Sequence, residues 1–137
     1  MKILSCGIVI INNNKILACV PFQRGQLDIP KGQQENGEKD IETAIRETKE
    51  ETGLSFSESD LIDCGTFKYL KNKDLHLYKT FKTIDIKSCR CTSFFDYKGH
   101  SVPEVTGYIW VNAINNFYKS LQPILIKIYK ELTNGIK

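Results

Sequence analysis

One helical segment carries an acidic face. Its apolar positions recur at helical spacing, and Gly53 stands where a glycine cap would end the helix. The apolar stripe consists of Ile41, Ala44, Ile45, Thr48 and Thr52. Because a helix turns by about 100° per residue, Glu47, Glu50 and Glu51 fall within one arc beside that stripe. The segment must therefore cover a core while gathering three carboxylates at its edge.

Such a cluster of like charges favours a bound cation. Like charges at i,i+3 and i,i+4 cost an isolated helix about 0.2 to 0.5 kcal/mol per pair, and a cation removes that cost. Carboxylate oxygens at short spacing suit Mg²⁺, with Mn²⁺ as the alternative ion. Arg46 lies one turn before Glu50 and is placed to orient a carboxylate. On the triad alone, an ordinary solvated helix face remains the alternative.

Strand-like segments surround this helix. Ile3–Ile11 and Lys15–Val20 are apolar runs joined by three asparagines, which predicts a hairpin. Further strands are predicted at Leu61–Leu70, Leu75–Ile86 and Tyr108–Val111. The chain is thus expected to contain a sheet.

The remaining segments are predicted as loops and one more helix. Gln23–Gln26 and Gln33–Glu38 are polar and predict loops, and Asp40 is the expected N-cap of the acidic helix. Cys89–Val105 lacks clean periodicity and predicts a long loop with room for one short strand. Gln122–Leu132 predicts a C-terminal helix, whose apolar positions are Leu125, Ile128, Tyr129 and Leu132.

Length and composition predict one soluble domain over residues 1–137. Hydrophobic residues make up 41% and charged residues 26%, which excludes a disordered chain. The longest apolar run, Gly7–Ile11, is far short of the ~20 residues that a membrane helix needs. The five cysteines are scattered, which is typical of reduced thiols. We therefore expect a cytoplasmic protein with no membrane partner.

The spacing of the acidic and glycine positions resembles the Nudix box. In that motif a glycine and a glutamate precede Arg-Glu, an aliphatic residue, Glu-Glu and a glycine in a loop–helix–loop. The matching positions are Gly32, Glu38, Arg46-Glu47, Glu50-Glu51 and Gly53-Leu54. Thr48 departs from the pattern, since an aliphatic residue is usual there, but its methyl group can face the core. The resemblance implies a Nudix hydrolase, which cleaves phosphoanhydride bonds with a divalent metal.

The resemblance also implies roles for the residues of the box. Glu47, Glu50 and Glu51 would bind the metal, with the backbone carbonyl of Lys31 as a further ligand. Glu38 and Arg46 would pair and hold the loop against the helix. The general base varies in the family: Glu47 is the first choice.

Residues outside the helix complete the predicted site. Glu104, in a later loop, is the alternative base or an additional acidic ligand by the same resemblance. The Lys31 ammonium would hold a phosphate oxygen. Arg24, in the loop before it, is the second candidate phosphate ligand, and an ordinary solvated loop residue is the alternative for it.

The Pro30-Lys31-Gly32 sequence resembles dinucleoside polyphosphate hydrolases and implies a substrate such as diadenosine tetraphosphate. Tyr69 stands about where those enzymes carry a tyrosine that contacts the nucleotide. Leu27 departs from them, since tryptophan is common there, and leaves Phe22 or Tyr69 to stack a base. Removal of pyrophosphate from RNA 5′ ends, cleavage of ADP-sugars including ADP-ribose, and cleavage of nucleoside triphosphates remain alternatives.

The family fold implied is an α/β/α sandwich, with a mixed curved sheet between the box helix and the C-terminal helix. The expected partner is a nucleotide-like small molecule, and the expected state is a monomer or homodimer. A non-catalytic nucleotide-binding module is the alternative from another class. A basic nucleic-acid-binding face is a third, because aromatic residues alternate with the lysines between Lys68 and Lys82.

Overall fold

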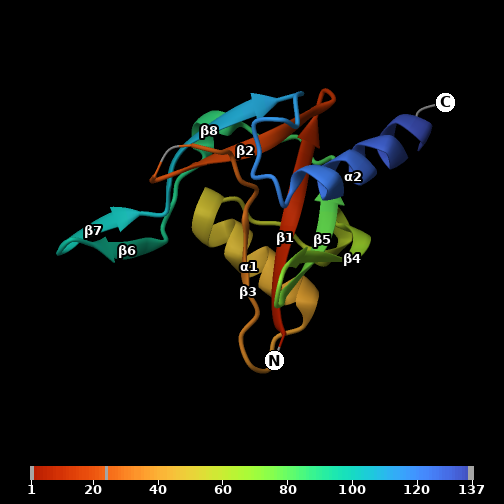
Figure 1. Ribbon diagram of the computed structural model, residues 1–137. Coiled ribbons are helices and arrows are strands. Elements are labelled where there is room, and N and C mark those ends of the chain that lie inside the picture. Colours follow the sequence, from red (N-terminus) through yellow and green to blue (C-terminus); the bar gives the residue numbers. More distant parts are fainter. Residues whose placement is uncertain (1, 24, 136–137) are drawn as a thin grey trace.

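The computed structural model describes residues 2–23 and 25–135, with side chains through residue 128. The strands are β1 (Ile3–Asn12), β2 (Lys15–Pro21), β3 (Lys31–Gln33), β4 (Ile62–Leu70), β5 (Lys73–Thr80), β6 (Phe94–Tyr97), β7 (His100–Pro103) and β8 (Val105–Val111). The helices are α1 (Asp40–Thr52) and α2 (Gln122–Gly135), with 3-10 turns at Glu58–Asp60 and Ile86–Ser88. Figure 1 shows their arrangement.

The main sheet is mixed, as predicted. Its strand order is β4-β5-β1-β2-β8, with β3 also paired to β1. β1 and β5 run parallel along most of their length, and the other pairs are antiparallel. β1 pairs with β2 only at its far end, through Ile11 and Asn12, and with β3 through Ser5–Gly7. The strand β1 therefore joins two halves of the sheet that diverge from each other (Figure 1).

Strict alternation along β1 builds a core on each face of the sheet. Cys6, Ile8 and Ile10 face α1, where they pack with Ala44 of that helix. Val9 and Ile11 belong to the opposite core, which holds Leu121, Ile124, Leu125 and Ile128 at and within the start of α2. The predicted α/β/α sandwich is confirmed. The side chains of Tyr129 and Leu132, also predicted to be apolar contacts of α2, lie outside the described residues.

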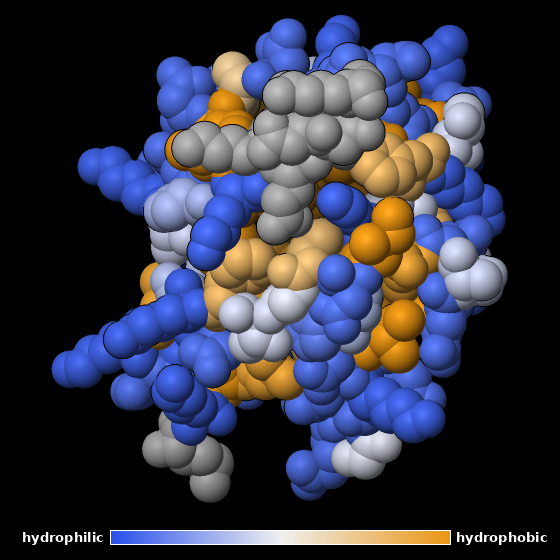
Figure 2. Space-filling model, turned by 90° about the vertical axis from the view of Figure 1, so that its right-hand side faces the viewer, coloured by the Kyte–Doolittle hydropathy of each residue, from blue (hydrophilic) through white to orange (hydrophobic). Residues whose placement is uncertain are grey.

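The aromatic residues of β4 and β5 pack inward, whereas Phe81, just after β5, is 48% exposed and lies beside Lys79. Tyr78 is buried in the core under α1, while Phe67 and Tyr69 pack against the core under α2. A shallow groove remains beside α2, lined by Phe67, Pro123 and Ile126 among others. Apolar side chains bordered by polar ones are visible on this side of the molecule in Figure 2. The basic face is thus the outer side of a packed sheet.

Four local predictions need correction. The predicted strand Leu75–Ile86 ends at Thr80, and Ile86 begins a 3-10 turn instead. The segment Cys89–Val105 is not a long loop, because it contains the hairpin β6–β7, and β8 already begins at Val105. Lys31–Gln33 pairs with β1 as a strand, where a loop was predicted from Gln33 onward. The N-cap of α1 is Lys39 rather than Asp40, and the Lys39 amide donates to the Glu42 carboxylate at 2.8 Å.

A histidine between two carboxylates holds the start of α1 against the sheet. His76 Nδ1 lies 2.6 Å from Asp40 Oδ2, and its Nε2 lies 2.7 Å from Asp63 Oδ1. Burial acts to lower the pKa of His76, but the bonds to Asp40 and Asp63 outweigh it and raise this pKa. The contact joins α1, β4 and β5 in one place.

Across residues 2–23 and 25–135, no helix is both long and apolar enough to cross a membrane.

Candidate active site

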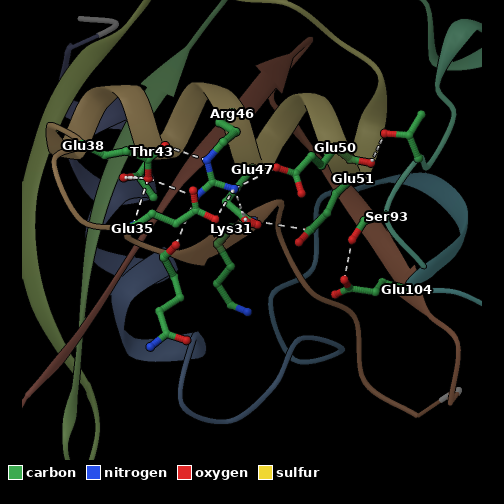
Figure 3. A network of polar contacts seen from close by, with 12 residues as sticks. Lys31, Glu35, Glu38, Thr43, Arg46, Glu47, Glu50, Glu51, Ser93 and Glu104 are labelled. Atoms are coloured by element: carbon green, nitrogen blue, oxygen red, sulfur yellow. Dashed lines mark hydrogen bonds and ion pairs between the residues drawn. The ribbon is translucent and has the colours of Figure 1, made fainter. Parts of the chain in front are cut away.

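Arg46 is the centre of the polar network on α1. Its Nε and Nη2 donate to the two oxygens of Glu38 at 2.6 and 3.0 Å, and its Nη1 donates to Glu50 at 2.7 Å. Nη2 also donates to the Gln33 carbonyl at 3.2 Å. The bond from Arg46 lowers the pKa of Glu38 to about 2. The predicted pairing of Glu38 with Arg46 is confirmed, and it ties the loop before α1 to the helix (Figure 3).

Glu47 lies against the backbone of β3. A Cβ atom added to Gly32 would stand 2.0 Å from the Glu47 carboxyl carbon, so only glycine leaves room for this carboxylate. The Glu47 side chain is 14% exposed. Burial, and then the charge of Glu50, raise the pKa of Glu47 to about 7. The first glycine of the box therefore makes space for an acidic side chain that is held away from bulk water.

Glu51 is the most deeply placed acid of the helix. Its carboxylate accepts a bond from the Lys31 amide at 3.4 Å, while its backbone carbonyl accepts one from the Tyr108 hydroxyl at 2.5 Å. Burial raises the pKa of Glu51 to about 9. Glu51 thus faces β3, whereas Glu50 turns toward Arg46 (Figure 3).

The Lys31 ammonium is held at one side of this acidic cluster. Its Nζ pairs with Asp28 at 2.9 Å and lies 5.6 Å from the centre of the Tyr69 ring. Burial acts to lower the pKa of Lys31, but the charge of Asp28 and the hydrogen bond to it outweigh burial and raise this pKa. The cation is therefore retained near the carboxylates of α1.

Glu104 reaches the same region from a distant part of the chain. It lies between β7 and β8, and its carboxylate accepts a short hydrogen bond from the Ser93 hydroxyl. Its own amide donates to the Ser93 carbonyl at 2.9 Å. Glu104 and Ser93 thus hold each other across the base of the β6–β7 hairpin (Figure 3).

Two adjoining open pockets connect these residues. One is lined by Gly32, Gln33, Gln34, Glu35, Arg46, Glu47 and Glu50, and the other by Cys19, Pro21, Asp28 and Val105. Lys31, Glu51 and Glu104 line both. Residues of α1, β3 and the start of β8 therefore share one concave surface, which combines several carboxylates with one ammonium group.

The donor set suits a hard divalent cation. Burial of Glu47 and Glu51 beside other acids raises both pKa values, and a cation would offset that unfavourable charge. Within the described ranges 2–23 and 25–135, no three His, Cys, Asp or Glu side chains are yet arranged to hold a metal ion. Glu50 is held by Arg46 through one carboxylate oxygen. The residue types lining the surface fit such a cation.

Most of the predicted site residues meet at this surface. Tyr69 is half-buried and does not line either pocket among the described residues, but its ring lies 5.6 Å from the Lys31 Nζ. Arg24 lies outside the described residues. Sequence reasoning missed Asp28, whose signal is its position three residues before Lys31, and Ser93, which has no signal in the sequence.

The family model of the NUDIX domain matches residues 1–107 of the chain, which include α1 and every acidic residue of this surface. The chain belongs to the NUDIX domain family. It is a Nudix hydrolase, a pyrophosphohydrolase that acts on substrates containing a pyrophosphate linkage, and such hydrolases generally use a divalent metal.

Relatives of this Nudix chain are found in sequence and in structure. It is 37% identical over 124 residues to an uncharacterized 17.7 kDa protein of enterobacteria phage T4 from the e-segB intergenic region, covering 79% of this chain and 81% of that one. Its fold is similar to an Ap4A hydrolase of C. elegans, with a TM-score of 0.67, 20% identity, and coverage of 96% and 98%. It is also similar to a MutT protein of Methanosarcina mazei Go1, with a TM-score of 0.69, 17% identity, and coverage of 99% and 96%.

Proposed function

We propose that this Nudix hydrolase cleaves a phosphoanhydride bond in a nucleoside diphosphate linked to another group, with Mg²⁺ as its metal. The observation that supports this most strongly is the shared lining of the two pockets by Lys31, Glu51 and Glu104. A diphosphate needs both kinds of group: carboxylates to hold the cation that neutralises it, and an ammonium to contact a phosphate oxygen directly. Mn²⁺ is the alternative ion.

The proposed roles follow from the positions of the side chains. Glu47, Glu50 and Glu51 hold the cation, together with the Lys31 carbonyl, and Arg46 positions Glu50. When bound, Mg²⁺ supplies charge stabilisation at the phosphate oxygens and lowers the pKa of a coordinated water.

In the reaction, a water oxygen forms a bond to phosphorus and the bridging P–O bond breaks. Glu47 is the proposed acceptor of the water proton, because its carboxylate lies in the pocket, against β3 and beside the other proposed cation ligands. Glu104, held by Ser93 on the opposite wall, is the second choice. The leaving phosphate carries away the electron pair of the broken bond.

The proposed substrate is a dinucleoside polyphosphate such as diadenosine tetraphosphate. The Pro30-Lys31-Gly32 sequence supports this choice, and the C. elegans protein of similar fold is an Ap4A hydrolase. ADP-ribose and other ADP-sugars, nucleoside triphosphates and the triphosphate end of RNA are the alternative substrates. A nucleotide-binding module without activity is the alternative function.

The test is chromatographic detection of hydrolysis products in the presence of Mg²⁺ from four compounds: diadenosine tetraphosphate, ADP-ribose, a nucleoside triphosphate mixture and 5′-triphosphorylated RNA. We expect the highest kcat/KM with diadenosine tetraphosphate. Glu51→Gln should lower turnover by orders of magnitude because the pocket loses a cation ligand. Turnover of one compound that disappears in this variant would identify the substrate class.

The matched control is Glu58→Gln, which removes an exposed acid outside both pockets. It should retain full activity. Full activity in Glu51→Gln would contradict the proposed site. Binding of these compounds without turnover would instead support the non-catalytic module.

A further inference from the structure

The hairpin β6–β7 is separate from the main sheet. Its strands pair only with each other within the described residues, and it projects from the body beside the end of β2 (Figure 1). The turn between them is Lys98-Gly99, with φ of 53° and 84°. Two consecutive positive φ values match the twist of a tight hairpin. Local turn chemistry thus forms the hairpin, but a two-stranded hairpin alone is marginally stable and needs a further contact.

Phe22 supplies that contact. Its ring meets Phe95 edge-on at 5.8 Å between centroids, with an interplanar angle of 82°, and meets Tyr97 at 5.2 Å and 61°. Phe95 and Tyr97 are two residues apart on β6, so they share one face of the hairpin. Phe22, Phe95 and Tyr97 therefore form an aromatic cluster, which we call the aromatic wall.

The aromatic wall is not part of the protein core. None of its three rings belongs to either core cluster formed by the described residues. The Phe95 side of the wall is open, since this residue is 38% exposed. The Tyr97 ring is partly covered by Lys98, whose Nζ lies 5.2 Å from its centre. In an edge-to-face pair the edge of one ring meets one face of the other, so each ring keeps at least one face outside that contact.

The wall adjoins the proposed active site through the backbone. The Phe22 amide donates to the Glu104 carbonyl at 3.0 Å, and Glu104 lines both pockets. Pro21, the residue before Phe22, lines the pocket that holds Lys31 and Glu51. The aromatic surface therefore begins where the polar surface ends, which is the order of groups in a nucleotide: charged phosphates first and a planar base beyond them.

We propose that the aromatic wall binds the nucleobase of the substrate, with Phe95 as the stacking residue. This inference rests on the proposed function, because it places the phosphates at Lys31 and the carboxylates. Base–aromatic stacking contributes to affinity for every base, so the wall confers a preference for nucleotides over other diphosphates without selecting one base.

The experiment separates base binding from phosphate binding. Isothermal titration calorimetry with Mg²⁺ measures the Kd of α,β-methylene-ADP, which resists hydrolysis, and of methylenediphosphonate, which has the same bridge but no base. Phe95→Ala should raise the Kd of α,β-methylene-ADP about tenfold. It should leave the Kd of methylenediphosphonate unchanged, and Phe95→Trp should bind α,β-methylene-ADP like the original chain.

Phe94→Ala is the matched control. Phe94 is the neighbouring residue on β6, points to the other face of the hairpin and is 55% exposed. This variant should retain the affinity for α,β-methylene-ADP. Equal losses in Phe94→Ala and Phe95→Ala, or no loss in Phe95→Ala, would overturn the inference.

Two further results would also overturn it and are distinct from failure of the proposed hydrolysis. If the original chain binds methylenediphosphonate as tightly as α,β-methylene-ADP, the base has no site, although the phosphate site stands. If sedimentation shows a dimer that Phe95→Ala converts to a monomer at unchanged nucleotide affinity, the wall is a contact between two copies. Absence of hydrolysis with normal binding of both ligands would contradict only the proposed function.

Discussion

The carboxylate of Glu47 lies in the space that a side chain at position 32 would need. Gly32 belongs to β3 and Glu47 to α1, so the contact sets how closely the acidic face of the helix approaches this strand. The two residues are fifteen positions apart, and both belong to the box. The missing side chain at Gly32 therefore determines where the charge of Glu47 is placed.

Gly32→Ala should impair catalysis far more than folding. The new methyl group would displace the flexible end of Glu47, which can rotate, so we expect the free energy of unfolding to change by less than about 1 kcal/mol. Misplacing a reacting group by about 1 Å can lower kcat about 100-fold. Urea denaturation measures the free energy of unfolding, and steady-state kinetics with the identified substrate measure kcat. Gly107→Ala, whose new methyl group meets only Val20 at ordinary contact distance, should change neither, and equal kcat losses in the two variants would contradict this account.

Arg46→Lys should uncouple the loop before α1 from the helix. A lysine cannot donate to both oxygens of Glu38 and also to Glu50, because its ammonium lacks the planar fork of arginine. We expect a loss of about 1.5 kcal/mol in the free energy of unfolding and a lower kcat. The reverse change at an exposed position of the same helix, Lys49→Arg, should be neutral in both assays. Equal stability of Arg46→Lys and the original chain would show that the network contributes little.

The metal-free protein should lose stability as pH rises. The pKa of Glu47 is raised from 4.5 to about 7 and that of Glu51 from 4.5 to about 9, so the fold binds these protons more tightly than the unfolded chain. Their contribution to stability is complete below pH 4.5 and is lost as pH rises toward 9. Thermal unfolding at pH 6 and pH 9, with EDTA and with Mg²⁺, tests this, and Mg²⁺ should stabilise the fold most at pH 9.

The variant Glu51→Gln isolates the contribution of one carboxylate. His76 has a raised pKa and gives the same sign of pH dependence, so the difference between the original chain and the variant is the informative quantity. The decline in Tm between pH 6 and pH 9 should be smaller in Glu51→Gln, because glutamine carries no titrating proton. An equally steep decline would assign the effect to other groups.

Thr48→Val should stabilise the chain. The Thr48 side chain is fully buried, and its hydroxyl has no hydrogen-bond partner among the described residues. An unpaired buried hydroxyl costs about 1 to 3 kcal/mol, and valine has nearly the same shape. We expect Tm to rise by about 3 °C or more, with unchanged kcat. The buried Thr52 bonds to the Thr48 carbonyl, so Thr52→Val should lower Tm instead, and a lower Tm in both variants would contradict this reasoning.

Local patterns account for most of the fold that could be predicted. Cys6 to Ile11 alternate between two cores, and Asn13 and Asn14 take the positive φ values of a tight turn, with 54° and 62°. The box helix ends at Gly53 in the left-handed conformation, as predicted. Each of these features depends on neighbouring residues, which a single sequence displays.

Features that depend on distant residues could not be predicted. The hairpin β6–β7 needs Phe22, more than seventy positions earlier, before its aromatic side chains have anything to pack against. The ion pair of Lys31 with Asp28 and the bond from Ser93 to Glu104 likewise arise only when strands meet. The acidic face of α1 was visible because its three glutamates share one helix, whereas the walls around it come from separate segments.

The end of α1 is attached to the segment before β6 through main-chain groups. The Arg90 amide donates to the Thr52 carbonyl at 2.9 Å, and the Thr92 amide donates to the Glu50 carbonyl at 2.7 Å. Hydrogen bonds between peptide groups do not depend on which side chains the two residues carry. Related chains can therefore exchange the amino acids at positions 90 and 92 while the end of the helix that carries the acids stays attached to this segment.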